Sequence, residues 1–359
     1  MTDKGLLTFF FGRRHKVTKM HSPFQYVAKT KHEPENKTGD VSAKTNVAFV
    51  RQCDYHTIFD KDNMKCIARN SEKGREISMK RLNKYKKKQL EGENIKGLLQ
   101  FKDNCWFNSL LMCLFFSDGG RKIMNSLRKE WIQSQVSSRQ SIYNVFTYLM
   151  EIPHYNKDIV NRIDSNMILA MLHSYDATIF EHPGYEGGSG ILYCSKLLSF
   201  LGLKNDYLEM RFIETNKGVY TEVNGVAKQY IHNSKVGGYI RNTHDTMKEP
   251  AIMAVFLHID TPFLLPKKIG NMLLDSVYLS NYNRNIYQHA IAGITCNKKQ
   301  YVYDGERALS VENDTLKKFD WASLGHKSFA MTYDKDKIVR YNFAKSVRVA
   351  FYVRKDNKK

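Results

Sequence analysis

The chain has 359 residues, of which 42% are hydrophobic, so it can bury the core of one large domain or of two modest ones. It carries 56 Lys and Arg against 36 Asp and Glu, and this formal net charge of +20 favours polyanionic partners. No apolar run approaches the ~20 residues that span a bilayer, and the start of the chain does not resemble a signal sequence. We therefore expect an intracellular protein without a membrane partner.

Residues 1–96 carry more than half of the net charge, because they hold 22 Lys and Arg against 11 Asp and Glu. We expect a basic, partly flexible extension over 1–96 and a separate domain over 97–359. Within the extension, 29–48 is polar enough to be mobile, and 80–88 is a basic helix candidate.

This extension allows three interpretations. The helix candidate is either a solvated linker or an electrostatic tether to nucleic acid, to which Phe9–Phe11 would add base stacking. Alternatively, the extension docks on the following domain through its apolar side chains, which are Val47, Phe49, Ile58 and Phe59. We slightly favour the tether over docking.

Cys105 stands at the start of a predicted helix. The apolar residues that follow recur at helical spacing and form one stripe, made of Phe107, Leu110, Leu111, Leu114 and Phe115. Asp103 and Asn104 are suitable caps before the helix, and residues 117–120 supply a stop. The first turn of a helix offers unpaired N–H groups and the positive end of the dipole, and both stabilise a thiolate. Cys105 is therefore a candidate nucleophile, and the alternative is a small buried residue that starts a core helix.

Two further elements are predicted in the middle of the chain. Residues 187–202 have the pattern of a glycine-rich turn, a helix and a glycine cap at Gly202. No Gly-Lys-Ser/Thr follows that turn, so it does not resemble a phosphate-binding loop. Ala251–Leu257 is a continuous apolar run, which predicts a buried strand.

His289 lies on a predicted β-hairpin, with one strand over 287–296 and the returning strand over 300–305. If Asn297-Lys298 is the two-residue loop, His289 faces Glu306, and Asp304 lies one diagonal step away on the same face. A register shift of one residue would turn Asp304 to the opposite face. An imidazole base needs such a carboxylate, because the acid fixes its tautomer and orientation. His289 and Asp304 are therefore the candidate partners of Cys105.

At these positions the sequence resembles the ubiquitin-specific proteases. The stretch 97–109 is similar to their cysteine box, Gly-Leu-x-Asn-x-Gly-Asn-Thr-Cys-Tyr-x-Asn-Ser, with identity at Gly97, Leu98, Cys105, Asn108 and Ser109. The stretch 289–304 resembles their histidine box, and 347–354 resembles their last strand. The three stretches cover about 40 residues. The resemblance implies an α+β, papain-like cysteine peptidase fold, in which the nucleophile helix of a helical lobe packs on a β-rich lobe that carries His289 and Asp304.

The sequence departs from the family pattern at several positions. Gln100 stands where the family has its oxyanion-hole asparagine, and its amide can still donate to an oxyanion. Lys102 replaces a glycine, and Gln288-His289-Ala290 replaces glycine-histidine-tyrosine. The acidic residues that the family places before its next helix, near 187, are absent. The paired C-x-x-C motifs of the family's zinc finger are absent too, because the six cysteines are scattered at 53, 66, 105, 113, 194 and 296. We expect no structural zinc and no cofactor, and we expect free thiols in a reducing compartment.

Together these residues predict a thiol-dependent peptidase or isopeptidase that releases ubiquitin or a ubiquitin-like modifier. Cys105 would attack the carbonyl, His289 would carry the proton, Asp304 would orient His289, and Gln100 would help to bind the oxyanion. The first alternative is a cysteine peptidase that processes structural polyproteins near nucleic acid in a large DNA virus, located in host cytoplasm, nucleus or virion. The others are a transglutaminase-like acyl transferase and a non-enzymatic, nucleic-acid-associated scaffold on a degenerate protease fold.

Overall fold

The computed structural model describes residues 53, 56–63, 65–85, 97–151, 164–184, 188–245, 249–259, 263–281, 289–306, 315–322, 328–334 and 337–355. The chain divides into two units, Met1–Gln52 and Cys53–Lys359, and every described residue belongs to the second. The predictions for Phe9–Phe11, residues 29–48, Phe49 and residues 86–88 lie outside the described residues. No helix in the described part is long and apolar enough to cross a membrane.

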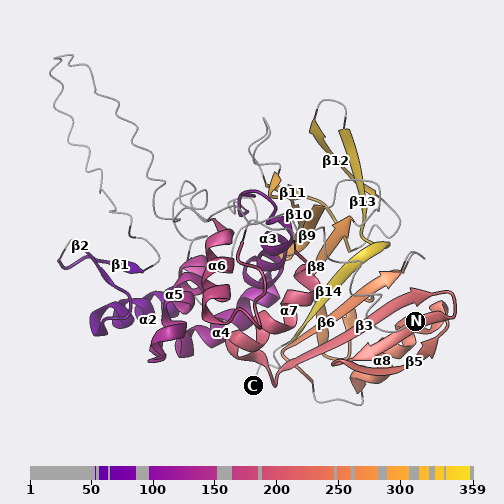
Figure 1. Ribbon diagram of the computed structural model, residues 1–359, viewed down its shortest axis with the longest axis horizontal. Coiled ribbons are helices and arrows are strands. Elements are labelled where there is room, and N and C mark those ends of the chain that lie inside the picture. The colour runs from indigo at the N-terminus through magenta and orange to yellow at the C-terminus, as the bar shows by residue number, and fades with distance from the viewer. Residues whose placement is uncertain are drawn as a thin grey trace. The chain divides into compact units, whose positions relative to one another are not determined.

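Helices are concentrated in the first half of this unit (Figure 1). The α-helices are α2 (Glu72–Tyr85), α3 (Cys105–Leu111), α4 (Asp118–Gln133), α5 (Ser137–Glu151), α6 (Ser165–Tyr175), α7 (Gly190–Leu198) and α8 (Val236–Asp245). Helix α3 continues as a π-helical turn, η3 (Met112–Phe116), and α7 as a second one, η6 (Ser199–Leu203). A short 3-10 turn, η7 (Asn233–Lys235), precedes α8.

Strands dominate the second half. They are β1 (Thr57–Asp60), β2 (Lys65–Ala68), β3 (Tyr207–Thr215), β4 (Gly218–Val223), β5 (Val226–Ile231), β6 (Ile252–Ile259), β7 (Lys268–Ile269), β8 (Met272–Asn281), β9 (His289–Cys296), β10 (Lys299–Tyr303), β11 (Leu316–Lys318), β12 (Ser328–Asp334), β13 (Lys337–Asn342) and β14 (Ser346–Arg354). The main sheet has the order β11-β10-β9-β8-β14-β6-β3-β4-β5, with β7 paired to β8. Its pairs are antiparallel except β3 with β6.

Both faces of the main sheet are apolar, because each face covers a separate core. On β6, Ala254 and Phe256 join the core shared with the helices, while Val255 and Leu257 join the core on the other face. A strand buried on both faces is expected to be a continuous apolar run, which confirms the buried strand predicted at 251–257. The predicted last strand, 347–354, is β14. The architecture is thus a mixed fold of helices packed on a large sheet.

The predicted apolar stripe runs along α3 and η3 and is completely buried, and α3 contacts β9, the strand that carries His289. The predicted stop over 117–120 is only half correct, because the helix ends at Ser117 but Gly119 and Gly120 lie in the first turn of α4. Their N–H groups bind the buried carboxylate of Asp275 on β8 at 2.7 and 3.0 Å. A Cβ atom on Gly119 would lie 2.3 Å from Val353. Glycine is required here because strand and helix approach closely, which the sequence alone does not show.

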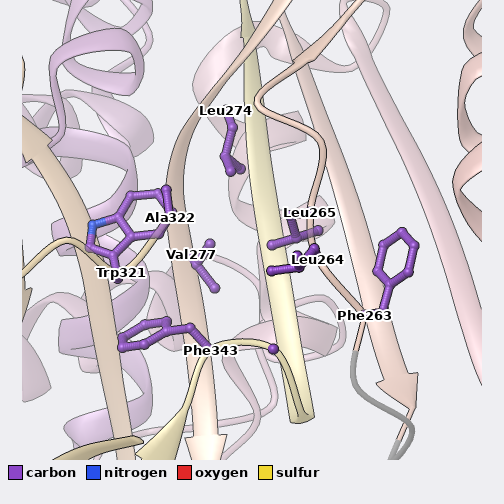
Figure 2. Close-up of a pocket in the computed structure, with 9 residues that line it drawn as sticks. Phe263, Leu264, Leu265, Leu274, Val277, Trp321, Ala322 and Phe343 are labelled. Carbon is purple, nitrogen blue, oxygen red and sulfur yellow. The ribbon is translucent and has the colours of Figure 1, made fainter. Parts of the chain in front are cut away.

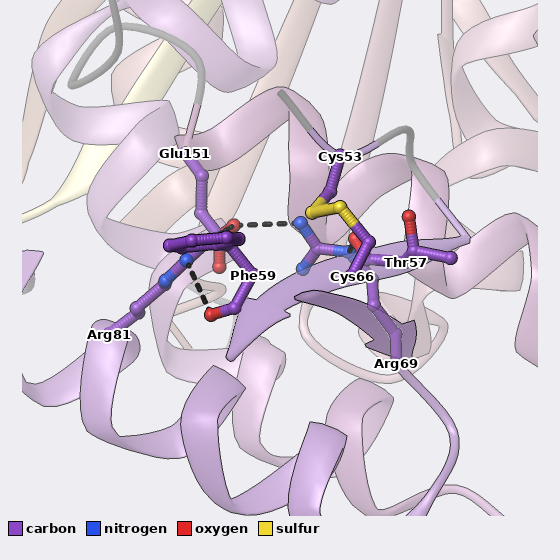
Figure 3. Close-up of a disulfide and its surroundings, with 7 residues drawn as sticks. All are labelled: Cys53, Thr57, Phe59, Cys66, Arg69, Arg81 and Glu151. Carbon is purple, nitrogen blue, oxygen red and sulfur yellow. Dashed lines mark hydrogen bonds and ion pairs between the residues drawn. A yellow bond between two sulfur atoms is a disulfide. The ribbon is translucent and has the colours of Figure 1, made fainter. Parts of the chain in front are cut away.

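The part of the N-terminal extension that the structure describes packs against the helices. Helix α2 spans Glu72–Tyr85, so the basic helix begins earlier than the predicted 80–88, and Leu82 is buried where α2 contacts α4. The carboxylate of Glu151, at the end of α5, pairs with Arg69 at 2.9 Å, and Figure 3 shows both beside Arg81. Ile58 on β1 is fully buried, as docking would require.

A disulfide joins Cys53 to Cys66 on β2, with Cα atoms 5.7 Å apart (Figure 3). This bond differs from the expectation that all six cysteines are free thiols. The two cysteines are separated by 13 positions and show no motif, so only the three-dimensional course of the chain brings them together. The other four cysteines are free.

Candidate functional site

The hairpin that carries His289 has the predicted register. Cys296 pairs with Lys299, and Asn297 and Lys298 form the two-residue loop. Both loop residues have positive φ, 49° and 63°, which is the type I′ geometry that matches the twist of the flanking strands. The carboxylate of Asp118, at the start of α4, accepts the N–H groups of Asn297 and Lys298, both at 3.1 Å. The loop is therefore held from outside the hairpin.

This register brings together the three residues predicted to react. His289 Nε2 lies 2.8 Å from Asp304 Oδ1, and both side chains are fully buried. The Cys105 side chain also lies close enough to His289 to raise the pKa of its imidazole. Cys105 is the only one of the four free cysteines that is not buried. The thiol at the start of α3, the imidazole and the carboxylate thus form one chain of contacts.

The environment of His289 favours its protonated form. Burial alone would lower the pKa of the imidazole, but hydrogen bonds to Asp304 and to Cys105 raise it, with a net pKa of about 10. His289 is therefore an imidazolium throughout the neutral range, and it loses the proton as the pH rises through about 10. A cation beside a thiol at a helix N-terminus favours the thiolate, which is the nucleophilic form of cysteine.

The loop before Cys105 is held by buried amides. Asn104 accepts the N–H of Phe101 at 3.1 Å and donates to Ser165 Oγ at 2.8 Å. Asn108 donates to the carbonyl of Leu99 at 2.9 Å. Asn104 is the residue before the helix, as predicted, but its side chain does not cap α3 because it is bound to the loop and to α6. These amides fix the approach of the chain to Cys105.

Lys102 adopts a left-handed conformation in this loop, with φ of +50°. This explains why glycine is the usual residue here in the family that the sequence resembles, because only glycine takes this conformation without cost.

We expect Lys102→Gly to raise the free energy of unfolding by about 0.5–1 kcal/mol, since relief of strain outweighs the added freedom of the unfolded chain. Chemical denaturation measures the change. Lys102→Ala removes the same side chain but keeps the Cβ atom, so it should bring no such gain. Equal stability of the two variants would contradict the proposal that the backbone is strained at Lys102.

Gln100 lies beside the segment that follows Asp304. Its backbone N–H donates to the carbonyl of Gly305 at 3.3 Å, and its side-chain oxygen is buried without a hydrogen bond from another described residue. Nearby, Tyr303 donates to the carbonyl of Leu98 at 2.6 Å. Gly97 packs so closely on Tyr303 that a Cβ atom would lie 2.5 Å from its ring. Gly97 and Leu98 thus both contact the hairpin that leads to Asp304.

Two features of the site were not assigned a role from the sequence. Glu306 Oε2 lies 3.8 Å from His289 Nδ1, although the hairpin register already placed Glu306 opposite His289. Trp106, the residue after the nucleophile, packs on His182 and Tyr193 with ring centroids 5.3 Å away in each case. His182 is in a stretch without a helical or strand pattern, so no sequence signal indicated it.

An apolar pocket on the sheet is lined by other residues (Figure 2). Its lining residues are Phe263, Leu264, Leu265, Leu274, Val277, Trp321, Ala322, Phe343 and Ala344. None of them is titratable or nucleophilic, so this pocket is not the candidate site. Among the described residues, no three His, Cys, Asp or Glu side chains gather as a metal site would require.

No family model and no curated protein matches the chain. Among solved structures, the chain is similar to the SAGA DUB module Ubp8/Sgf11/Sus1/Sgf73 bound to monoubiquitin, with a TM-score of 0.43, 10% identity, and coverage of 84% of this chain and 79% of that chain. It is also similar to the Pan2 pseudoubiquitin hydrolase–RNA exonuclease module of Saccharomyces cerevisiae, with a TM-score of 0.43, 12% identity, and coverage of 73% and 55%. A third is an essential yeast splicing factor, with a TM-score of 0.42, 10% identity, and coverage of 84% and 83%. At these scores and identities, the similarities carry no argument about function.

Proposed function

We propose that the protein is a papain-like cysteine peptidase that cleaves a peptide or isopeptide bond. The observation that carries this proposal is the placement of Cys105, the accessible free cysteine at the start of α3, beside an imidazole that is paired with a buried carboxylate. Each group has the environment that its role demands.

Acylation would proceed from the thiolate–imidazolium pair. The Cys105 sulfur attacks the carbonyl carbon, and the C–S bond forms as the carbonyl oxygen becomes an oxyanion. Collapse of this intermediate breaks the C–N bond, and the leaving amine takes the proton of His289. Neutral His289 then removes a proton from a water molecule, whose oxygen attacks the thioester. Loss of the Cys105 thiolate releases the acid and restores the ion pair.

Gln100 and the backbone N–H of Cys105 are the proposed donors to the oxyanion. The amides of Asn104 and Asn108 already donate within the protein, to Ser165 and to the carbonyl of Leu99. Gln100 stands five positions before Cys105, and its backbone lies next to the segment that follows Asp304.

We expect Gln100→Ala to reduce kcat by ~10²–10³ with little change in KM, because the donor acts mainly in the transition state. Steady-state kinetics on a fluorogenic substrate measure both constants. Asn104→Ala should instead lower stability, since it removes the side-chain hydrogen bonds to Phe101, Ser165 and Asn108. An unchanged kcat in Gln100→Ala would assign the oxyanion to another donor.

The proposed substrate is ubiquitin or a ubiquitin-like protein, and this rests on the resemblance of residues 97–109, 289–304 and 347–354 to ubiquitin-specific proteases. A ubiquitin probe with a C-terminal electrophile tests it. Labelling that is lost in Cys105→Ala supports a deubiquitinase. Labelling by small thiol electrophiles alone indicates a peptidase for another substrate, and no labelling by either indicates a scaffold on a degenerate protease fold.

A further inference from the structure

Glu306 brings a second carboxylate to the imidazole. Its Oε2 lies 3.8 Å from His289 Nδ1, while Asp304 binds Nε2 at 2.8 Å on the other side of the ring. The two acids are two positions apart, and the backbone N–H of Glu306 donates to Asp304 Oδ1 at 3.0 Å. One short turn therefore supplies a carboxylate to each ring nitrogen.

The residue between the two acids makes this turn possible. A Cβ atom on Gly305 would lie 2.5 Å from the Tyr303 hydroxyl and 3.2 Å from Gln100 Cβ. Because both neighbours belong to the site, a side chain at 305 would push the turn away from the imidazole.

We propose that Glu306 is a positioning residue of the Cys105–His289 pair, which stabilises the imidazolium from the Nδ1 side of the ring, opposite Asp304. This inference rests on the proposed function. Asp304 alone would hold the ring by one nitrogen. With Glu306 present, the positive charge is stabilised on both sides, in the ion pair and again when His289 takes the proton of the water that attacks the thioester.

Groups from three other elements also face His289. Cys105 faces it from α3, Asp304 from the end of β10, and the Tyr341 ring from β13 at a centroid distance of 6.5 Å. His289 and Asp304 side chains are fully buried, whereas the Glu306 side chain is 27% exposed. Water therefore moderates the influence of Glu306 on His289 without removing it.

The test is the titration of His289 in the full-length protein with Glu306→Gln. Loss of a charge about 4 Å from Nδ1 should lower the pH at which His289 loses its proton by roughly 0.5–1 unit. NMR of ¹³C-labelled histidine measures this directly, with the resonance assigned by its absence in His289→Gln. Glu76→Gln is the matched control, because Glu76 is exposed on α2, where it pairs with Lys80 at 2.6 Å. It should leave the titration unchanged.

A second readout is the rate at which iodoacetamide alkylates Cys105 as a function of pH. Both limbs of the profile should move to lower pH in Glu306→Gln, because the lost negative charge had disfavoured the thiolate and favoured the imidazolium. Glu306→Asp should give a smaller shift. An unchanged His289 titration in a folded Glu306→Gln protein would overturn the inference. Neither readout needs a substrate. A protein that shows these shifts but cleaves no ubiquitin would therefore contradict the proposed substrate and leave the role of Glu306 intact.

Discussion

Replacement of Cys105 by alanine is expected to abolish hydrolysis, and His289→Ala should do the same. The two residues act as a unit, because the thiolate needs the imidazolium to form and the leaving amine needs its proton. Asp304→Asn should leave measurable turnover, since an amide still contacts Nε2 but no longer supplies the charge that favours the imidazolium. Turnover of a fluorogenic peptide or ubiquitin substrate measures all three variants.

Cys194→Ala is the matched control for the nucleophile, because it removes a buried free thiol elsewhere in the helical core. It should keep turnover close to that of the unchanged protein. Wild-type turnover in Cys105→Ala would refute the assignment of the nucleophile. Complete loss in Asp304→Asn with an intact fold would show that the charge of the acid is indispensable for turnover.

Glu151→Ala is expected to produce the largest loss of stability, about 3–5 kcal/mol. Its carboxylate is fully buried and pairs with Arg69 and Arg128 at 2.9 Å each and with Arg81 at 3.7 Å. Removing it leaves buried guanidinium groups without a counter-charge. This destabilises the fold by far more than the intact ion pairs stabilise it. Chemical denaturation at neutral pH measures the change. Glu181→Ala, which breaks an exposed pair with Lys196, should cost at most about 1 kcal/mol.

The same carboxylate gives the fold an acid-sensitive element. Burial opposes ionisation of Glu151, but Arg69 and Arg128 outweigh it and hold the pKa of this carboxyl below its ordinary value. Its contribution to stability is therefore complete above pH about 4.5 and declines as the pH falls through the lowered pKa. A shallower loss of stability below this pH in Glu151→Gln would bear this out, whereas an identical pH dependence would contradict it.

Patterns of nearby residues in the sequence predicted the parts of the candidate site that are formed by residues close together in the chain. The apolar period defined α3, and the alternation around Asn297-Lys298 fixed the register that places Asp304 beside His289. What the sequence could not show are contacts between distant residues. The start of α4 at Asp118 depends on Asp275, 156 positions away from Gly119, and the docking of α2 depends on Glu151. A glycine pair is normally a stop signal, and only the approaching carboxylate makes it a helix start.

The position of β14 has a consequence for how the protein is made. This strand is the last one described, yet it lies in the interior of the main sheet, paired with β8 on one side and β6 on the other. During synthesis, the two sides of the sheet therefore cannot join until the ribosome has released residues 346–354. Cys105 emerges about 250 residues earlier, which at roughly 5–20 residues per second is a delay of roughly 12–50 s. For that whole interval a nascent chain would carry the α3 helix before the sheet on which it packs is complete, although His289 on β9 and Asp304 after β10 emerge earlier, on one side of β14.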